Sequence, residues 1–187
     1  MKKGLLAAGL ALALITPLAQ ADQAAVDRLR EAGFPLTPEA EAEVLAAPAD
    51  QVGSVLSRLV DQAVRANPAG AGDIVSSAVT AEPGQAAAIT AVAVAAVPNQ
   101  AAAVTSAAVT AAPDAAADIA AAAVGSAPEA ADSIRQAAIN SAPDQAANIQ
   151  AASGDAQRES QQTSQTMNQG NANLSGDDVS DNVASDN

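Results

Sequence analysis

The sequence predicts an all-α fold: an alanine-rich, α-solenoid-like stack of short helices with a disordered C-terminal tail. Alanine, the strongest helix former, supplies 54 of the 187 residues. Proline returns every 15 residues through the middle of the chain, and the apolar residues between the prolines follow the spacing of one helix face. We therefore divide the chain into a signal peptide (1–21), an N-terminal helical cap (22–67), six 15-residue helical repeats (68–152, the last one incomplete) and a disordered tail (153–187).

The first 21 residues have the three parts of a secretory signal peptide. Two lysines follow Met1, residues 4–18 are apolar, and Ala19 and Ala21 place small residues on the N-terminal side of a cleavage site. The apolar run is short for a membrane-spanning helix, and no cysteine follows it that could carry a lipid anchor. We expect a bacterial exported protein, in the periplasm, in the medium or at the cell surface, whose mature chain begins at Asp22.

The residues between the signal peptide and the repeats predict a helical cap. Two short helices are expected over residues 24–31 and 38–46, with Thr37 as the N-cap of the second. Residues 33–35 form the turn between them, and we interpret Phe34, the only aromatic residue, as a small core plug. A third helix is expected in the segment before Pro68. It keeps the spacing of the repeats, has bulkier and more charged side chains than they do, and is expected to cover the end of the stack.

The repeat itself is marked by six prolines with a constant spacing of 15 residues: Pro68, Pro83, Pro98, Pro113, Pro128 and Pro143. In the complete units, positions 3 and 10 after the proline are alanine, and positions 6 and 11 are isoleucine or valine. These four positions share one face of an α-helix. Since an interior proline costs about 3 kcal/mol, each unit predicts one helix of about 10–12 residues with the proline in its first turn.

Fifteen residues hold one helix, so burial of its apolar face requires neighbouring units. We expect successive helices to run roughly antiparallel, with two units forming a hairpin and the hairpins stacking into a solenoid. Each buried isoleucine or valine contributes about 1.5–3 kcal/mol, whereas ordering each residue costs on the order of 1.5 kcal/mol. This balance leaves six units marginal and predicts a protein partner or self-association.

Composition excludes most catalytic chemistry. The chain has no histidine and no cysteine, and both of its lysines lie in the predicted signal peptide. Catalytic triads, thiolate or imidazole metal sites and Schiff-base lysines are therefore absent from the mature chain. We assign no catalytic, cofactor-binding or metal-ligating residue and expect a protein that is not an enzyme. A small-molecule ligand is not expected either, because one phenylalanine cannot line an aromatic-rich pocket.

Charge excludes two further classes of partner. The mature chain has six arginines against 21 acidic residues, a net charge of −15. Nucleic acids and anionic membranes would repel such a surface, and we expect no stable membrane insertion after the signal peptide is removed. The acidic residues are interpreted as keeping an alanine-rich surface soluble.

The tail from residue 153 consists mainly of Gln, Asn, Ser, Gly and Asp, with few large apolar residues. Such a composition cannot bury enough surface to offset the entropy of ordering. We therefore expect this segment to be disordered.

Three functions are compatible with these features. The first is a structural or interaction (scaffold) protein, for which the uncharged residues 83–113 are the first surface to test. The second is a fibre-forming, amyloid-like matrix subunit, because residues 88–97 alternate in a way that suits a strand as well as a helix. The third is an ice- or surface-binding protein, which would present threonine at a fixed position of the repeat. Thr90 and Thr105 occupy one such position, and Thr80 and Thr110 occupy another.

Overall fold

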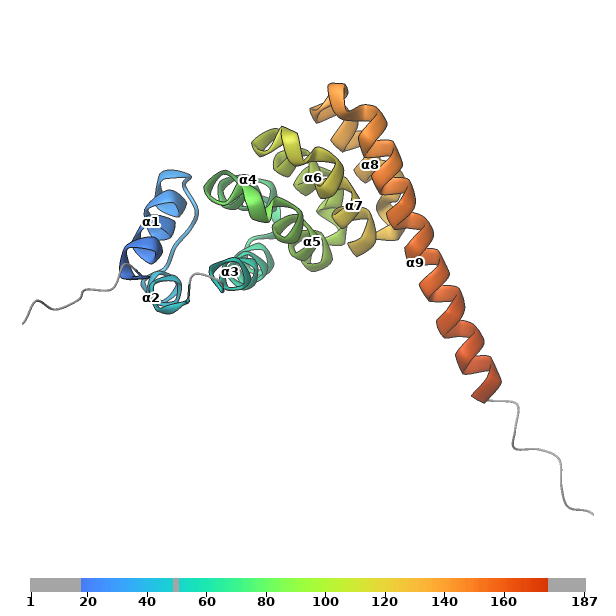
Figure 1. The fold of residues 1–187 in the computed structure, drawn as a ribbon, viewed down its shortest axis with the longest axis horizontal. Helices are drawn as coiled ribbons and strands as arrows, with labels where there is room; N and C mark the ends of the chain where they lie inside the picture. Colours follow the sequence, from blue (N-terminus) through green and yellow to red (C-terminus); the bar gives the residue numbers. More distant parts are fainter. Residues whose placement is uncertain (1–17, 49–50, 175–187) are drawn as a thin grey trace, which may run out of the picture.

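A computed structural model describes residues 18–48 and 51–174. Most of the predicted signal peptide and residues 175–187 of the predicted tail lie outside the described residues. Within the described part every regular element is helical, which confirms the all-α prediction (Figure 1). The α-helices are α1 (Leu18–Glu31), α2 (Pro38–Ala46), α3 (Val52–Ala66), α4 (Ala71–Ala81), α5 (Ala86–Ala96), α6 (Ala101–Ala111), α7 (Ala116–Ser126), α8 (Ala131–Ser141) and α9 (Ala146–Leu174).

Each repeat begins with a three-residue 3₁₀ turn rather than with the α-helix itself. Pro98, for example, opens the turn Pro98–Gln100, and the 11-residue helix α6 follows directly. The residue before the proline, Val97, has φ −137° and ψ 70°, because the proline ring bars its neighbour from the α region. Its amide still donates to the carbonyl of Ala93 at 3.0 Å. Each proline therefore ends one helix and redirects the chain into the next.

The helices stack in two rows. Figure 1 shows α4, α6 and α8 in one row and α3, α5, α7 and α9 in the other. The main contacts join helices two units apart, such as α5 with α7 and α6 with α8, and consecutive helices contact each other less. The hydroxyls of Ser106 on α6 and Ser141 at the end of α8, 2.8 Å apart, lie on such an interface. The predicted stack is confirmed, but its strongest contacts lie within a row and not within a hairpin.

The core contains the side chains at the four repeat positions predicted to be buried, 3, 6, 10 and 11 after the proline, and those at one further position. We call the residues at one position in successive units a column. Isoleucine at the sixth position after the proline is fully buried in α5, α7, α8 and α9. The additional column is the seventh position, where Val75, Thr90, Thr105 and Ala120 are all fully buried. The Thr90 and Thr105 hydroxyls donate to the backbone carbonyls four residues earlier, both at 2.7 Å. This local bond satisfies the hydroxyl, so threonine is accepted inside the stack.

The N-terminal cap contains both predicted short helices, but α1 begins at Leu18, within the predicted signal peptide, and not at residue 24. Helix α2 has the expected bounds, and Thr37 Oγ1 accepts from the Ala40 amide at 3.2 Å. Helix α1 ends at Glu31, and Gly33 in the turn that follows has φ +79°, the left-handed conformation that favours glycine. The Phe34 amide then donates to the Leu29 carbonyl at 2.9 Å. These bonds turn the chain so that Phe34 points back into the core, 5% exposed.

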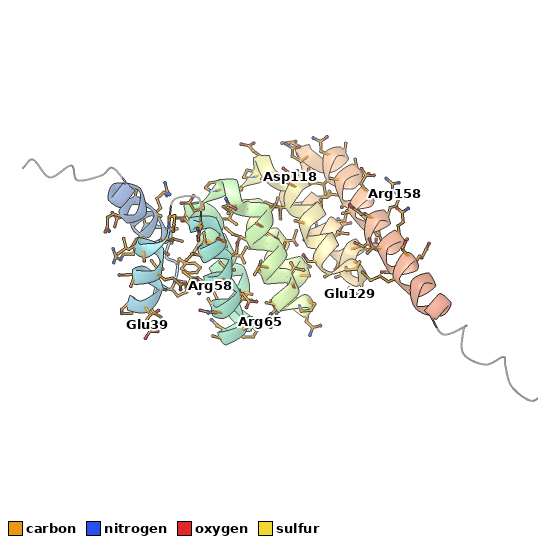
Figure 2. All side chains as sticks on the ribbon, turned by 60° about the horizontal axis from the view of Figure 1, so that its bottom comes forward. Glu39, Arg58, Arg65, Asp118, Glu129 and Arg158 are labelled. Carbon is orange, nitrogen blue, oxygen red and sulfur yellow. The ribbon has the colours of Figure 1, made fainter. Side chains whose placement is uncertain are left out.

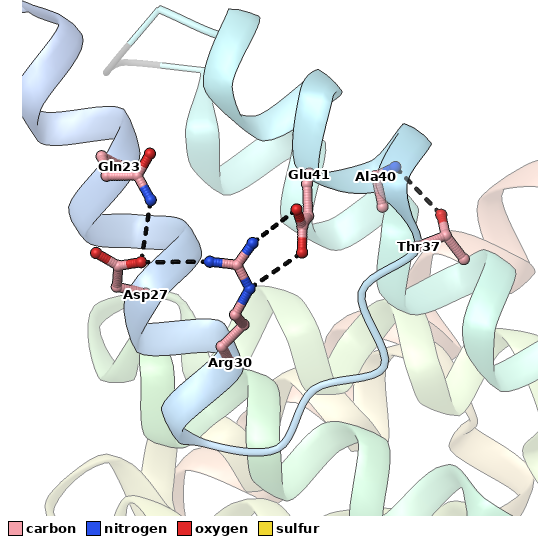
Figure 3. A network of polar contacts seen from close by, with 6 residues as sticks. All are labelled: Gln23, Asp27, Arg30, Thr37, Ala40 and Glu41. Atoms are coloured by element: carbon pink, nitrogen blue, oxygen red, sulfur yellow. Dashed lines mark hydrogen bonds and ion pairs between the residues drawn. The ribbon is translucent and has the colours of Figure 1, made fainter.

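Arginine side chains join the cap helices to one another and to the repeats. Figure 3 shows Arg30 of α1 between Asp27 of its own helix and Glu41 of α2. Its Nε and Nη2 atoms lie 3.1 and 2.7 Å from the two carboxylate oxygens of Glu41. Two further ion pairs, Arg28–Glu82 and Arg58–Glu43, connect α1 with the end of α4 and α3 with α2. All three arginines are about half exposed, so each pair contributes only about 0.2–1 kcal/mol.

The C-terminal end differs from its expected boundary. The sequence predicts that the repeats end at residue 152 and that residues 153–187 are disordered. That prediction is wrong for residues 153–174, because helix α9 continues to Leu174. Ser153 is fully buried, and its hydroxyl accepts from Arg135 Nε at 3.1 Å. Arg135 Nη2 also donates to Gln157 Oε1 at 3.0 Å. These contacts hold the first turns beyond residue 152 against α8, and no proline after Pro143 interrupts the helix.

Within the described residues, no helix combines the length and the apolarity needed to cross a membrane.

Candidate functional site: an opening in the apolar core

The uncharged stretch, residues 83–113, presents a neutral surface of small residues. Most of its large apolar side chains, including Ile89, Val94, Val104 and Val109, are fully buried, and Val92 and Val97 are half-buried. Its exposed residues are prolines, small residues or amides, including Ala88, Ala95, Asn99, Gln100, Ala103 and Thr110. Figure 2 labels charged side chains at the cap end, such as Arg58, and toward α9, such as Arg158. The middle of the stack is therefore a neutral band between two charged ends.

Residues 88–97, whose alternation suits a strand as well as a helix, lie almost entirely in helix α5 in this structure. Thr90, on this helix, and Thr105, on α6, are fully buried, so neither hydroxyl is available to a surface ligand. Thr80 and Thr110 are exposed, and each donates to a carbonyl of its own helix, at 2.7 and 2.8 Å.

A pocket of about 390 Å³ lies where the cap meets the repeats. Phe34 and Thr37 line it from the loop between α1 and α2, Leu59 and Ala63 from α3, and Ile74 from α4. Three separate parts of the chain therefore form its walls. We call this space the Phe34 pocket.

The burial of one repeat column locates the same opening independently. At the sixth position of the repeat, Leu59 and Ile74 each remain 6% exposed, whereas Ile89, Ile119 and Ile134 are 0% exposed. The column is thus fully buried from α5 onward and slightly exposed at α3 and α4. The cause lies in the cap, because α1 and α2 contact α4 and α3 less extensively than the repeats contact one another.

The polar groups of the Phe34 pocket are uncharged. Thr37 Oγ1 is occupied as the N-cap of α2, and Asn67 Oδ1 accepts from the Gly70 amide at 3.3 Å. Gln62, the third polar residue of the lining, is exposed. No aspartate, glutamate or arginine belongs to the lining, so the pocket offers apolar contact and amide hydrogen bonds but no counter-charge.

The described residues contain no cluster of three or more side chains that could hold a metal ion. The sequence predicts no site residue and assigns Phe34 only a role in the core. The structure gives Phe34 that role and also places it on the pocket wall. No sequence signal marks the pocket, because it arises from the imperfect fit between cap and repeats.

Comparison with known proteins identifies no relative: no protein-family model, no curated protein and no solved structure matches the chain.

Proposed function

We propose that this protein is an exported, non-enzymatic scaffold that binds a protein partner, or another copy of itself, through its helical-repeat surface. The observation that carries the proposal is the continuous two-row stack from α3 to α9, built on one apolar core. Such a stack offers an extended surface and needs no reactive side chain. A partner that binds the neutral band over residues 83–113 does not have to desolvate a charged side chain there.

Two features of the sequence support the remaining parts of the proposal. The basic and apolar segments with a small-residue cleavage site in residues 1–21 support export. The absence of histidine and cysteine throughout the chain supports a role in binding rather than catalysis.

The test uses the mature chain from Asp22, whose only primary amine is its N-terminus because both lysines precede that residue. Coupling through this amine displays every molecule in one orientation. The bead-bound chain is exposed to an envelope extract of the source organism, and self-association is measured by sedimentation velocity. Two variants are compared, Ala88→Glu on α5 and Asn148→Glu on α9, which are exposed and occupy the same repeat position.

We expect a defined complex with the native chain, its loss with Ala88→Glu, and its retention with Asn148→Glu. Because both variants add one carboxylate at equivalent positions, a general effect of charge would weaken both equally. Equal behaviour of the two variants, or no complex with the native chain in either assay, would refute binding through the neutral band.

A further inference from the structure

The geometry points to a ligand site that is independent of the proposed scaffold function: we propose that the Phe34 pocket binds one small, uncharged, largely apolar molecule. Sequence alone argues against a small-molecule ligand because the chain has a single aromatic residue. The structure places that residue on the wall of the pocket, beside Leu59 and Ile74.

The size of the pocket fits a compact molecule. Its volume of about 390 Å³ falls within the range of about 300–1,000 Å³ that is typical of small-molecule sites. Phe34, Leu59 and Ile74 are each 5–6% exposed, so their side chains form a floor that is nearly buried but still reachable.

The shape favours a compact molecule over a segment of polypeptide. The opening ends where the sixth-position column closes, since Ile89 and the isoleucines beyond it are fully buried. An extended peptide would need a groove that continues along several helices, and this one does not continue past α4. A compact ligand needs only the space between the cap loop and α3.

The lining selects against charge. It contains no ionisable side chain, and the mature chain is strongly acidic. An anion would be desolvated without a counter-charge and repelled by the surrounding surface. An uncharged apolar molecule would instead displace water that the apolar walls cannot hydrogen-bond. The amides of Gln62 and Asn67 provide hydrogen bonds for one polar group of such a ligand.

The test compares two probes with the same aromatic skeleton. N-Phenyl-1-naphthylamine is neutral, and 8-anilinonaphthalene-1-sulfonate adds one negative charge. Both become fluorescent in apolar surroundings, and the protein has no tryptophan or tyrosine to contribute a background. We expect saturable binding of one neutral probe per chain, with the sulfonate binding at least about tenfold more weakly, equivalent to about 1.4 kcal/mol.

Two pairs of variants locate the binding site. Ala63→Leu fills the pocket from α3, and Ala88→Leu adds the same group to the exposed face of α5. We expect Ala63→Leu to weaken binding of the neutral probe at least about tenfold and Ala88→Leu to leave it within about twofold. The second pair is Ala66→Leu in the pocket lining and Ala96→Leu at the same repeat position of α5, and only the first of these should weaken binding.

Far-UV circular dichroism of every variant confirms that the helices are intact. The proposal is overturned if the native chain shows no saturable binding, if both probes bind equally, or if the pocket-filling variants bind as tightly as their controls. Loss of the scaffold complex with Ala88→Glu has no bearing on this result, so the two proposals fail separately.

Discussion

Leucine should have opposite effects on stability at two alanines of the same repeat column, Ala63 and Ala93. Both occupy the tenth position of the 15-residue unit, Ala63 on α3 and Ala93 on α5. Ala93 is fully buried, whereas Ala63 is half-buried and lines the Phe34 pocket. The column is therefore fully buried at Ala93 and partly exposed at Ala63.

The expected magnitudes follow from the space available. Leucine adds three carbon atoms to alanine, and at Ala93 these atoms meet a packed interior, so Ala93→Leu should destabilise the protein by about 1–3 kcal/mol. At Ala63 the same atoms enter the pocket. With about 0.8 kcal/mol gained per buried methylene and burial of about half of the added group, Ala63→Leu should stabilise the protein by about 1 kcal/mol.

The assay is urea unfolding of the mature chain, followed by far-UV circular dichroism, with the denaturant slope compared between variants. An unchanged slope shows that the midpoint reports stability and not a change in the unfolded state. The two midpoints should move in opposite directions from the native value. Equal destabilisation by both substitutions would refute the pocket, and no effect of either would refute the burial of the whole column.

The same assay tests three further features. Gly33→Ala should destabilise the cap by about 1–2 kcal/mol because of its positive φ, whereas Gly84→Ala, with open space around its added Cβ, should not; equal effects would contradict the assigned turn. Thr90→Val should change stability by less than about 1 kcal/mol, because a lost hydrogen bond of about 0.5–1.5 kcal/mol is offset by about 0.8 kcal/mol from a buried methyl; a much larger loss would show that the hydroxyl is structurally required. A chain ended after Ala152 should be less stable by about 1–3 kcal/mol than one ended after Leu174, since it lacks the partners of Arg135; equal stability would place the functional end of the stack at residue 152.

Much of the fold could be predicted because the constant 15-residue period of the repeat shows which residues occupy equivalent positions in each helix. The constant spacing of the prolines fixes where each helix ends, and α2 was predicted with its observed bounds from Thr37 and the following proline. The buried threonine column could not be recognised in the same way. Thr90 and Thr105 look polar in a sequence, and only the bond from each hydroxyl to its own helix makes burial acceptable.

The pocket and the length of α9 depend on contacts between distant segments. The Phe34 pocket exists because the cap covers α3 and α4 incompletely, and no local pattern in residues 33–37 or 59–67 encodes that fit. The first turns of α9 beyond residue 152 are held by Arg135, 18 residues before Ser153 in the chain, which bonds to the Ser153 hydroxyl. Composition alone predicts disorder from residue 153 onward, because it shows that the residues are polar but not that Arg135 bonds to one of them.

The two-row arrangement also constrains how the number of repeats can change during evolution. Successive units alternate between rows, so each helix packs mainly on the helices that lie two units before and after it. Loss of a single 15-residue unit would transfer every later helix to the opposite row, and α9 would then emerge from the side that now carries α4, α6 and α8. Loss or duplication of two units together would leave α9 on its present side. Homologues that preserve the position of α9 should therefore differ from this chain by an even number of units.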